Sequence, residues 1–254
     1  MNFQDHFSSQ SEIYSKARPT YPDELFTYLR SLSPSGEACW DCATGNGQAA
    51  VALSNHFKQV IATDGSEKQL QNAVQKDNIQ YRLATAEQSG LPDSSVDLIT
   101  VATAAHWFEL DKFYKEAERV AKPNAILAVW TYSEAKISDD INEMMTWFAY
   151  DYLLNYWPDG RWYVRKKYET LPFPFEMIKT PEFICQRDWN RQQWLNYVMS
   201  WSAYNNYVAK HNTDPLQILM PKLNPLWNEN DIRHVVWPLH IKCTCLNSST
   251  YYKK

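Results

Sequence analysis

The chain has 254 residues, a formal net charge of −4 at pH 7, and 44% hydrophobic and 21% charged residues. These values are typical of a globular protein and argue against a disordered chain or a basic nucleic-acid binder. No apolar run approaches the roughly 20 residues that cross a membrane, and the polar N-terminus lacks a secretory signal. The five cysteines lack the spacing of a zinc site or a disulfide framework, so we expect no metal site and free thiols in a reducing compartment. Together these observations predict a cytoplasmic protein without a membrane contact.

Strands and helices are predicted to alternate in the first half of the chain. A turn at Arg18–Pro22 comes first, and Ser66 is expected to cap a helix. The expected strands cover residues 38–42, 59–63, 79–84, 96–102 and 125–131. The expected helices cover residues 23–32, 48–57, 66–75 and 110–121. This alternation predicts a doubly wound parallel sheet with right-handed crossovers.

The second half is rich in aromatic residues, since most of the 15% aromatic share lies after residue 106. Helices are expected at residues 141–156, 192–209 and 215–227, and strands at 182–189 and 240–246. The composition indicates an aromatic cap or apolar cavity in this half.

A short motif carries the functional signal. Two of only six glycines, Gly45 and Gly47, follow Asp41, and Asp64 ends an apolar run 64 − 41 = 23 positions later. Glycine lets the backbone approach a ligand, a helix N-terminus offers free N–H groups, and a distal carboxylate accepts ribose hydroxyls. The layout therefore indicates a nucleotide-type site after the first strand.

Two cofactors fit this motif. The segment Gly45–Ala50, with Asp64, matches the dinucleotide pattern G-x-G-x-x-G/A. A pyrophosphate would be repelled by Asp41, whereas S-adenosylmethionine has no phosphate and presents an ammonium and a sulfonium. The acid favours S-adenosylmethionine over a nicotinamide cofactor and over an ordinary strand-to-helix turn.

These residues resemble the class I S-adenosylmethionine-dependent methyltransferases with a type-11 domain. Asp41, Ala43, Gly45 and Gly47 stand at the first motif, with alanine at the usual first-glycine position. The resemblance implies a Rossmann-like α/β fold with a doubly wound, seven-stranded, mostly parallel sheet. Its last strand would be antiparallel, and a helical cap would be inserted after strand five.

Four further segments resemble a subgroup that includes trans-aconitate methyltransferase-like enzymes: Tyr14–Pro22, Ala105–Phe108, Ser200–Ala203 and Trp237–His240. The resemblance then spans nearly the whole chain and implies a small-molecule acceptor. It divides the chain into an N-terminal lid segment and helix (1–37), a cofactor-binding core (38–131), and an aromatic cap with the last two strands (132–254).

The resemblance implies specific cofactor contacts. Asp41 would hold the ammonium of the cofactor, Asp64 its ribose hydroxyls, and Ala86 and Glu87 would lie beside the adenine, unless Glu87 faces solvent. The implied cofactor-binding residues are Tyr14, Arg18, Asp41, Ala43, Gly45, Gly47, Asp64, Gly65, Gln69, Ala86, Glu87 and Thr103. Tyr14 and Arg18 would belong to a closing lid, or Arg18 would only anchor the chain.

His106, Trp107 and Trp130 are expected to line the acceptor pocket. His106 is the candidate general base, with a hydrogen-bonded wall residue as the alternative. The basic group Arg161, Arg165, Lys166 and Lys167 is expected to be a solvated face.

The expected reaction transfers a methyl group to a small organic acceptor, a carboxylate ahead of a hydroxyl, and releases S-adenosyl-L-homocysteine. No nucleic-acid partner is expected. A non-catalytic cofactor-binding subunit and a nicotinamide-dependent oxidoreductase are the alternatives.

Overall fold

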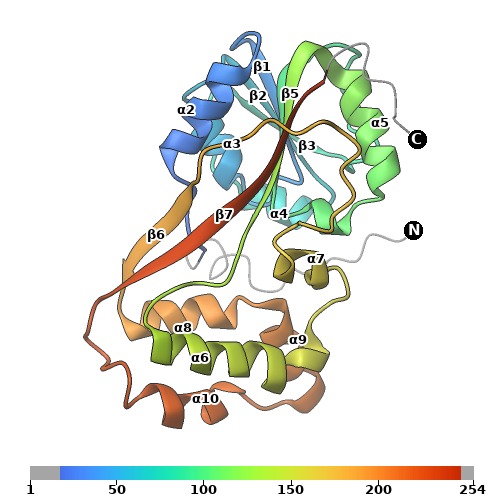
Figure 1. Ribbon diagram of the computed structural model, residues 1–254. Coiled ribbons are helices and arrows are strands. Elements are labelled where there is room, and N and C mark those ends of the chain that lie inside the picture. The colour runs from blue at the N-terminus through green and yellow to red at the C-terminus, as the bar shows by residue number, and fades with distance from the viewer. Residues whose placement is uncertain (1–17, 247–254) are drawn as a thin grey trace.

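The computed structural model describes residues 18–246, which form one seven-stranded sheet in the order β3-β2-β1-β4-β5-β7-β6 (Figure 1). Strands β1 to β5 pair in parallel, and β7 is antiparallel to both of its neighbours. The strands are β1 (Ala38–Cys42), β2 (Gln59–Asp64), β3 (Ile79–Leu83), β4 (Val96–Ala102), β5 (Ala121–Tyr132), β6 (Ile184–Trp189) and β7 (Arg233–Leu246). The predicted doubly wound, mostly parallel fold is confirmed.

The helices lie on both faces of the sheet and at one end of it. The helical elements are α2 (Asp23–Leu32), α3 (Gln48–Leu53), α4 (Glu67–Gln71), η2 (Ala105–Trp107), α5 (Leu110–Val120), α6 (Asp139–Trp147), η3 (Phe148–Tyr152), η4 (Leu154–Tyr156), α7 (Arg161–Arg165), α8 (Arg191–Met199), α9 (Ser202–His211) and α10 (Leu216–Leu223). Helices α2 and α3 share one buried cluster with the sheet, and α5 belongs to a second cluster.

The central strands explain where a ligand site can form. All five residues of β1 are buried, as are the first six of β4, because each strand is covered on both faces. Trp40 pairs with Ile61 on one side and Ile99 on the other, so the carboxyl ends of β1, β2 and β4 meet at one edge. Ligands of open α/β sheets bind at such an edge, where the strand order reverses.

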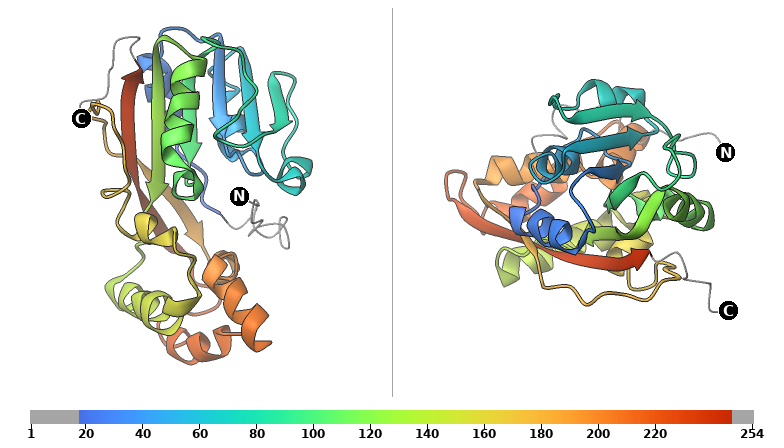
Figure 2. Two further views of the ribbon diagram at one scale, coloured as in Figure 1. Left: turned by 90° about the vertical axis from the view of Figure 1, so that its right-hand side faces the viewer. Right: turned by 90° about the horizontal axis from the view of Figure 1, so that it is seen from above.

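The cap lies beyond this edge. Figure 1 shows β5 running toward a group formed by α6, α8, α9 and α10, with α7 between that group and the sheet. The turned view in Figure 2 shows the same separation. These helices come from two connections, β5 to β6 and β6 to β7, so a single insertion after strand five is an incomplete description.

Several predicted boundaries shift for identifiable reasons. Strand β5 begins directly at Ala121 and contains Pro123, because Ala121 pairs with Val96 before a bulge in the ladder. The helix expected at 192–209 is divided, since Trp201 is extended with φ −71° and ψ 138°. The last strand starts at Arg233 instead of His240, because its first half pairs with β6.

Other helices are shorter than expected. Helix α3 ends at Leu53 and α4 at Gln71, although Ser66 caps α4 as predicted by accepting from the Gln69 N–H. The helix expected at 141–156 changes after Trp147 into a π-helical turn and a 3-10 turn.

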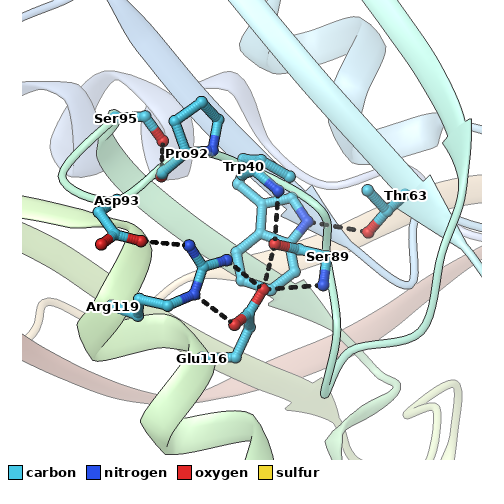
Figure 3. A network of polar contacts seen from close by, with 9 residues as sticks. Trp40, Thr63, Ser89, Pro92, Asp93, Ser95, Glu116 and Arg119 are labelled. Carbon is cyan, nitrogen blue, oxygen red and sulfur yellow. Dashed lines mark hydrogen bonds and ion pairs between the residues drawn. The ribbon is translucent and has the colours of Figure 1, made fainter.

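An ion-pair network fixes the loop that leads into β4 (Figure 3). The Glu116 carboxylate accepts from the Ser89 backbone N–H at 2.8 Å and from Arg119 Nε and Nη2, each at 2.8 Å. Arg119 Nη1 also donates to Asp93 at 2.5 Å. The hydrogen bonds from Arg119, followed by those from Ser89, lower the pKa of Glu116 to about 2 despite its burial. The network therefore joins α5 to residues 89–93.

Candidate functional site

The loop after β1 has three residues in the left-handed region of backbone space. Ala43, Gly45 and Gly47 have φ angles of 54°, 59° and 85°. A Cβ atom on Gly47 would collide with the Tyr81 hydroxyl, whereas one on Gly45 would meet nothing within 4 Å. Glycine is favoured at 47 chiefly by its φ of 85°, a conformation that other residues rarely adopt, and Gly45 leaves open space at the carboxyl edge of the sheet.

Asp64 ties this loop to the end of β2. Its Oδ2 accepts from the Gly45 backbone N–H at 2.8 Å, and its Oδ1 accepts from the Ser66 N–H at 2.8 Å. The carboxylate is nearly buried, and Gly65 and Gln69 follow it in the next turn. A carboxylate oxygen can accept more than one hydrogen bond, so this is the type of group that can bind a hydroxyl of a ligand.

Asp41 lies one layer deeper, in β1. The side chain is fully buried; Thr44 donates to its Oδ2 at 2.5 Å, and Thr100 of β4 donates to its Oδ1 at 2.7 Å. Burial raises the pKa of Asp41 to about 6, and the charge of Asp64 adds to the rise, while the two threonines oppose it. A cation placed nearby would favour the ionised form.

The predicted adenine-side residues lie after β3. Ala86 is buried, and the Glu87 Oε1 accepts from the Glu109 backbone N–H at 3.0 Å, just before α5. Glu87 is thus half-buried and bound to the backbone instead of extending freely into solvent.

Thr103 joins β4, β5 and the N-terminal turn. It has a φ of 56°, and its N–H donates to the Trp130 carbonyl oxygen at 2.8 Å. Its hydroxyl lies 3.3 Å from the hydroxyl of Tyr21. Tyr21 was absent from the predicted site, although it belongs to the signature segment Tyr14–Pro22, which was the available signal.

Arg18 is held by residues of the fold itself. Its Nη1 donates to the Tyr132 hydroxyl at 2.5 Å, its Nη2 donates to the Ser200 carbonyl at 3.0 Å, and its guanidinium lies 5.6 Å from the centroid of the Tyr197 ring. These contacts favour the anchoring alternative. Tyr14 lies outside the described residues, so the lid stays a prediction.

The predicted acceptor residues follow β4 and lie in β5. His106 Nδ1 is 2.8 Å from the Tyr168 hydroxyl, and burial, followed by the charge of Arg161, lowers the pKa of His106 to about 3. Such an imidazole is neutral at pH 7 and a weak base, which favours the wall alternative. Trp107 is 39% exposed and contacts His106, whereas Trp130 is fully buried, so its ring belongs to the core.

Outside the predicted site, three features of residues 18–246 concern other pockets, metal sites and membrane-spanning helices. A groove of about 370 Å³ runs between residues 20–22 and β6, and none of the predicted site residues lines it. No group of three His, Cys, Asp or Glu side chains is arranged there to hold a metal ion. Within the same range, none of the helices combines the length and apolar character that a membrane span requires.

The sequence is similar to those of known methyltransferases. Residues 40–129 match a methyltransferase domain family. A Dictyostelium discoideum protein named as a methyltransferase is 34% identical over 233 residues, covering 90% of this chain and 89% of its own. A Saccharomyces cerevisiae protein, CRG1, named as an S-adenosylmethionine-dependent methyltransferase, is 22% identical and covers 81% of this chain and 83% of its own.

A solved structure agrees over almost the whole length. The structure named as a type II methyltransferase from Anaeromyxobacter dehalogenans has a TM-score of 0.84 and 34% identity, covering 91% of this chain and 98% of its own. The chain therefore belongs to the S-adenosylmethionine-dependent methyltransferases, with S-adenosylmethionine as its cofactor.

Proposed function

We propose that this methyltransferase acts on a small organic acceptor and belongs to the trans-aconitate methyltransferase-like subgroup. The observation that supports this most is that the aromatic cap lies beyond the carboxyl ends of the strands, on the side of the sheet where the glycine loop is (Figure 1). A space walled by tryptophan and tyrosine suits a small, partly apolar molecule. The net charge of −4 disfavours a nucleic-acid substrate, and we place the protein in the cytoplasm.

The residues of the glycine loop fit the cofactor. Asp64 would accept the ribose hydroxyls, and Asp41, held by Thr44 and Thr100, would attract the ammonium group of the methionine part. The open space over Gly45 would admit the cofactor against the backbone. The adenine would lie beside Ala86 and Glu87. The bound cofactor supplies an electrophilic methyl group on a sulfonium.

The acceptor would lie beside Trp107 and the loop after β4. A sulfonium is already reactive, so the main contributions of the protein are orientation and the exclusion of water. A carboxylate acceptor is ionised at pH 7 and needs no base, which agrees with the lowered pKa of His106. His106 would then orient the acceptor wall through its hydrogen bond with Tyr168.

Calorimetric titration with S-adenosylhomocysteine and NAD tests the cofactor site. The wild-type protein should bind S-adenosylhomocysteine and not NAD. Asp64→Ala should lower the affinity 10- to 100-fold, because it removes an ionised acceptor worth about 1.5–3 kcal/mol. Glu67→Ala, which removes an exposed acid three residues away, is the matched control and should bind like wild type. Equal affinity in Asp64→Ala and Glu67→Ala would place the ribose elsewhere.

A turnover screen tests the acceptor class. Protein with methyl-labelled S-adenosylmethionine is incubated with carboxylic acids, phenols and amines, and transferred label is measured. Label on a small acid or phenol supports the proposal. Tight cofactor binding with no transfer to any of these acceptors would favour the alternative of a non-catalytic cofactor-binding subunit.

A further inference from the structure

Arg161, the first residue of α7, carries a cation without a counterion in the described part of the chain. Its guanidinium lies 4.8 Å from the centroid of the Trp157 ring. Its Nε is buried and has no hydrogen-bond partner, and none of the ion pairs within residues 18–246 includes this side chain. A buried donor on a charged group is costly when unmatched, so it indicates a partner that residues 18–246 do not supply.

The backbone beside Arg161 lies against the loop after β4. A Cβ atom on Gly160 would lie 2.7 Å from the His106 carbonyl oxygen, so only glycine permits this approach. Helix α7 lies between the sheet and the cap helices (Figure 1). This position places Arg161 at the edge where the acceptor is proposed to bind.

The charge of Arg161 reaches groups from several elements. It contributes, after burial, to the lowered pKa of His106, and it opposes the burial that raises the pKa of Tyr150, Tyr168 and Tyr197. These four side chains come from η2, from η3, from the segment after α7, and from α8. These four groups are aromatic or imidazole side chains and carry no negative charge at pH 7. The acid Glu134 acts on Tyr150 as well, but it is exposed and forms no ion pair with Arg161.

The other charged side chains nearby are hydrogen-bonded to residues of the fold or are exposed to solvent. Glu134 is hydrogen-bonded to the Tyr150 hydroxyl, and Arg18 lies over the Tyr197 ring while donating to Tyr132 and Ser200. Arg165 is exposed and lies 4.2 Å from the centroid of Tyr150. Arg165, Lys166 and Lys167 are all exposed, as expected of a solvated face, but the buried Nε of Arg161 does not fit that expectation.

We propose that Arg161 binds a carboxylate group of the methyl acceptor and thereby selects acids over their neutral analogues; this rests on the proposed function. The planar guanidinium presents a fork of N–H donors that matches a carboxylate in two parallel hydrogen bonds. Trp157 on one side of the fork restricts its orientation. A ligand carboxylate would neutralise the cation and satisfy its donors in surroundings where water competes weakly.

Calorimetry in the presence of saturating S-adenosylhomocysteine tests this assignment without relying on turnover. The probes are hexanoate, phenylacetate and succinate, each compared with its neutral amide. At least one acid should bind the wild-type protein, and its amide should bind at least tenfold more weakly. Arg161→Gln should reduce the affinity for that acid about 10- to 100-fold, because charge-assisted hydrogen bonds are lost.

Variants of α7 supply the controls. Arg165→Gln, which removes a cation one turn away, should change the affinity for the acid less than twofold. Arg161→Lys keeps the charge without the fork and should give an intermediate affinity. The melting temperature of Arg161→Lys and its affinity for S-adenosylhomocysteine should equal those of wild type. This variant can therefore still test the inference if Arg161→Gln folds poorly.

Three results would overturn the inference: no probe acid binds, acid and amide bind alike, or Arg161→Gln and Arg161→Lys both bind the acid as wild type does. Failure of the proposed function is distinct, because it would appear as a wild-type protein that binds acids through Arg161 and transfers no labelled methyl group to them.

Discussion

The two sides of the proposed site are built in different ways. On the cofactor side, residues 41–64 supply the left-handed loop, the open space over Gly45 and both acids from one stretch of chain. On the acceptor side, the groups come from distant segments, among them His106, Tyr168 and Arg161. The first side is acidic and shaped by backbone, whereas the second is aromatic and basic. The identity of the cofactor can therefore be inferred from one sequence motif. The residues of the acceptor pocket, in contrast, are brought together only by the tertiary fold.

The largest effect is expected from the network that supports the cofactor side. Glu116→Gln should lower the free energy of unfolding by about 2–3 kcal/mol, because Arg119 loses an ionised partner that is only 10% exposed. The folded pKa of Glu116 is about 2, against 4.5 in the unfolded chain. The ionised group therefore contributes its full stability above pH 4.5, about 3 kcal/mol, and loses it as the pH falls toward 2.

Urea unfolding followed between pH 7 and pH 3 measures both effects. Glu118→Gln, on the same helix and outside this network, is the matched control and should change stability far less. A variant Glu116→Gln as stable as Glu118→Gln would show that the network in Figure 3 does not support the fold.

The next largest effect is a pH dependence of cofactor affinity caused by Asp41, and it tests whether the cofactor side depends on negative charge. Because burial raises the pKa of Asp41 to about 6, the negative charge that we propose attracts the cofactor ammonium is lost as the pH falls below this value. Affinity for S-adenosylhomocysteine should fall about tenfold from pH 7 to pH 5, and Asp41→Asn should remove this dependence.

Adenosine lacks the amino-acid part of the cofactor and serves as the control ligand. The affinity of the protein for adenosine should stay nearly constant from pH 7 to pH 5. An equal decrease for adenosine and S-adenosylhomocysteine would assign the titration to a different group.

A smaller effect tests where the two sides meet. Trp107→Ala should reduce kcat/KM for the acceptor up to about tenfold, since aromatic contacts contribute about 0.5–1.5 kcal/mol beyond buried area. Affinity for S-adenosylhomocysteine should be unchanged. Trp162→Ala removes another exposed tryptophan, 52% exposed on α7, and should leave both values near wild type. If Trp107→Ala weakened cofactor binding but kept normal turnover at saturating cofactor, Trp107 would belong to the cofactor side.

The smallest effect is expected at Ala43, where the chain differs from the usual motif. A non-glycine residue with a φ of 54° costs about 1–2 kcal/mol, and glycine recovers this at the expense of about 0.4–1 kcal/mol of unfolded-state entropy. Ala43→Gly should therefore raise stability by about 0.5–1 kcal/mol in thermal unfolding, with cofactor affinity preserved. Ala52→Gly, within helix α3, should instead lower stability. A loss of stability in both variants would show that the alanine methyl group contributes packing here.

Local pattern predicted the strands that the core buries on both faces. The bounds of β1 and β4 agree with the expectation because each is a short, mostly apolar segment with small or polar residues after it. The start of β7 at Arg233 was missed because this first part, which contains Pro238, is held as a strand by pairing with β6, a contact that only the fold creates. The break at Ser200–Trp201 was missed for a similar reason, since both residues are buried among distant elements and neither is a helix breaker.

The site divides in the same way. The loop after β1 bonds to both acids of the motif, since Gly45 donates to Asp64 and Thr44 donates to Asp41, and the contacts of these residues with the cofactor stay predictions. Arg161 was read as part of a solvated face, because a cluster of four basic residues gives no sign that one of them turns inward. Gly160, the residue before it, packs against the His106 loop, a contact that the sequence alone does not reveal.

Strand β7 gives the molecule a mechanical property. Its first half, up to Pro238, is hydrogen-bonded to β6, and its second half, from Leu239, is hydrogen-bonded to β5, so one unbroken strand belongs to two ladders in series. Figure 1 shows it extending from the sheet to the cap. A hinge between cap and sheet would have to break these hydrogen bonds or bend the strand. We therefore expect the cap to keep a fixed position relative to the sheet, so that the space for the acceptor changes little when ligands bind.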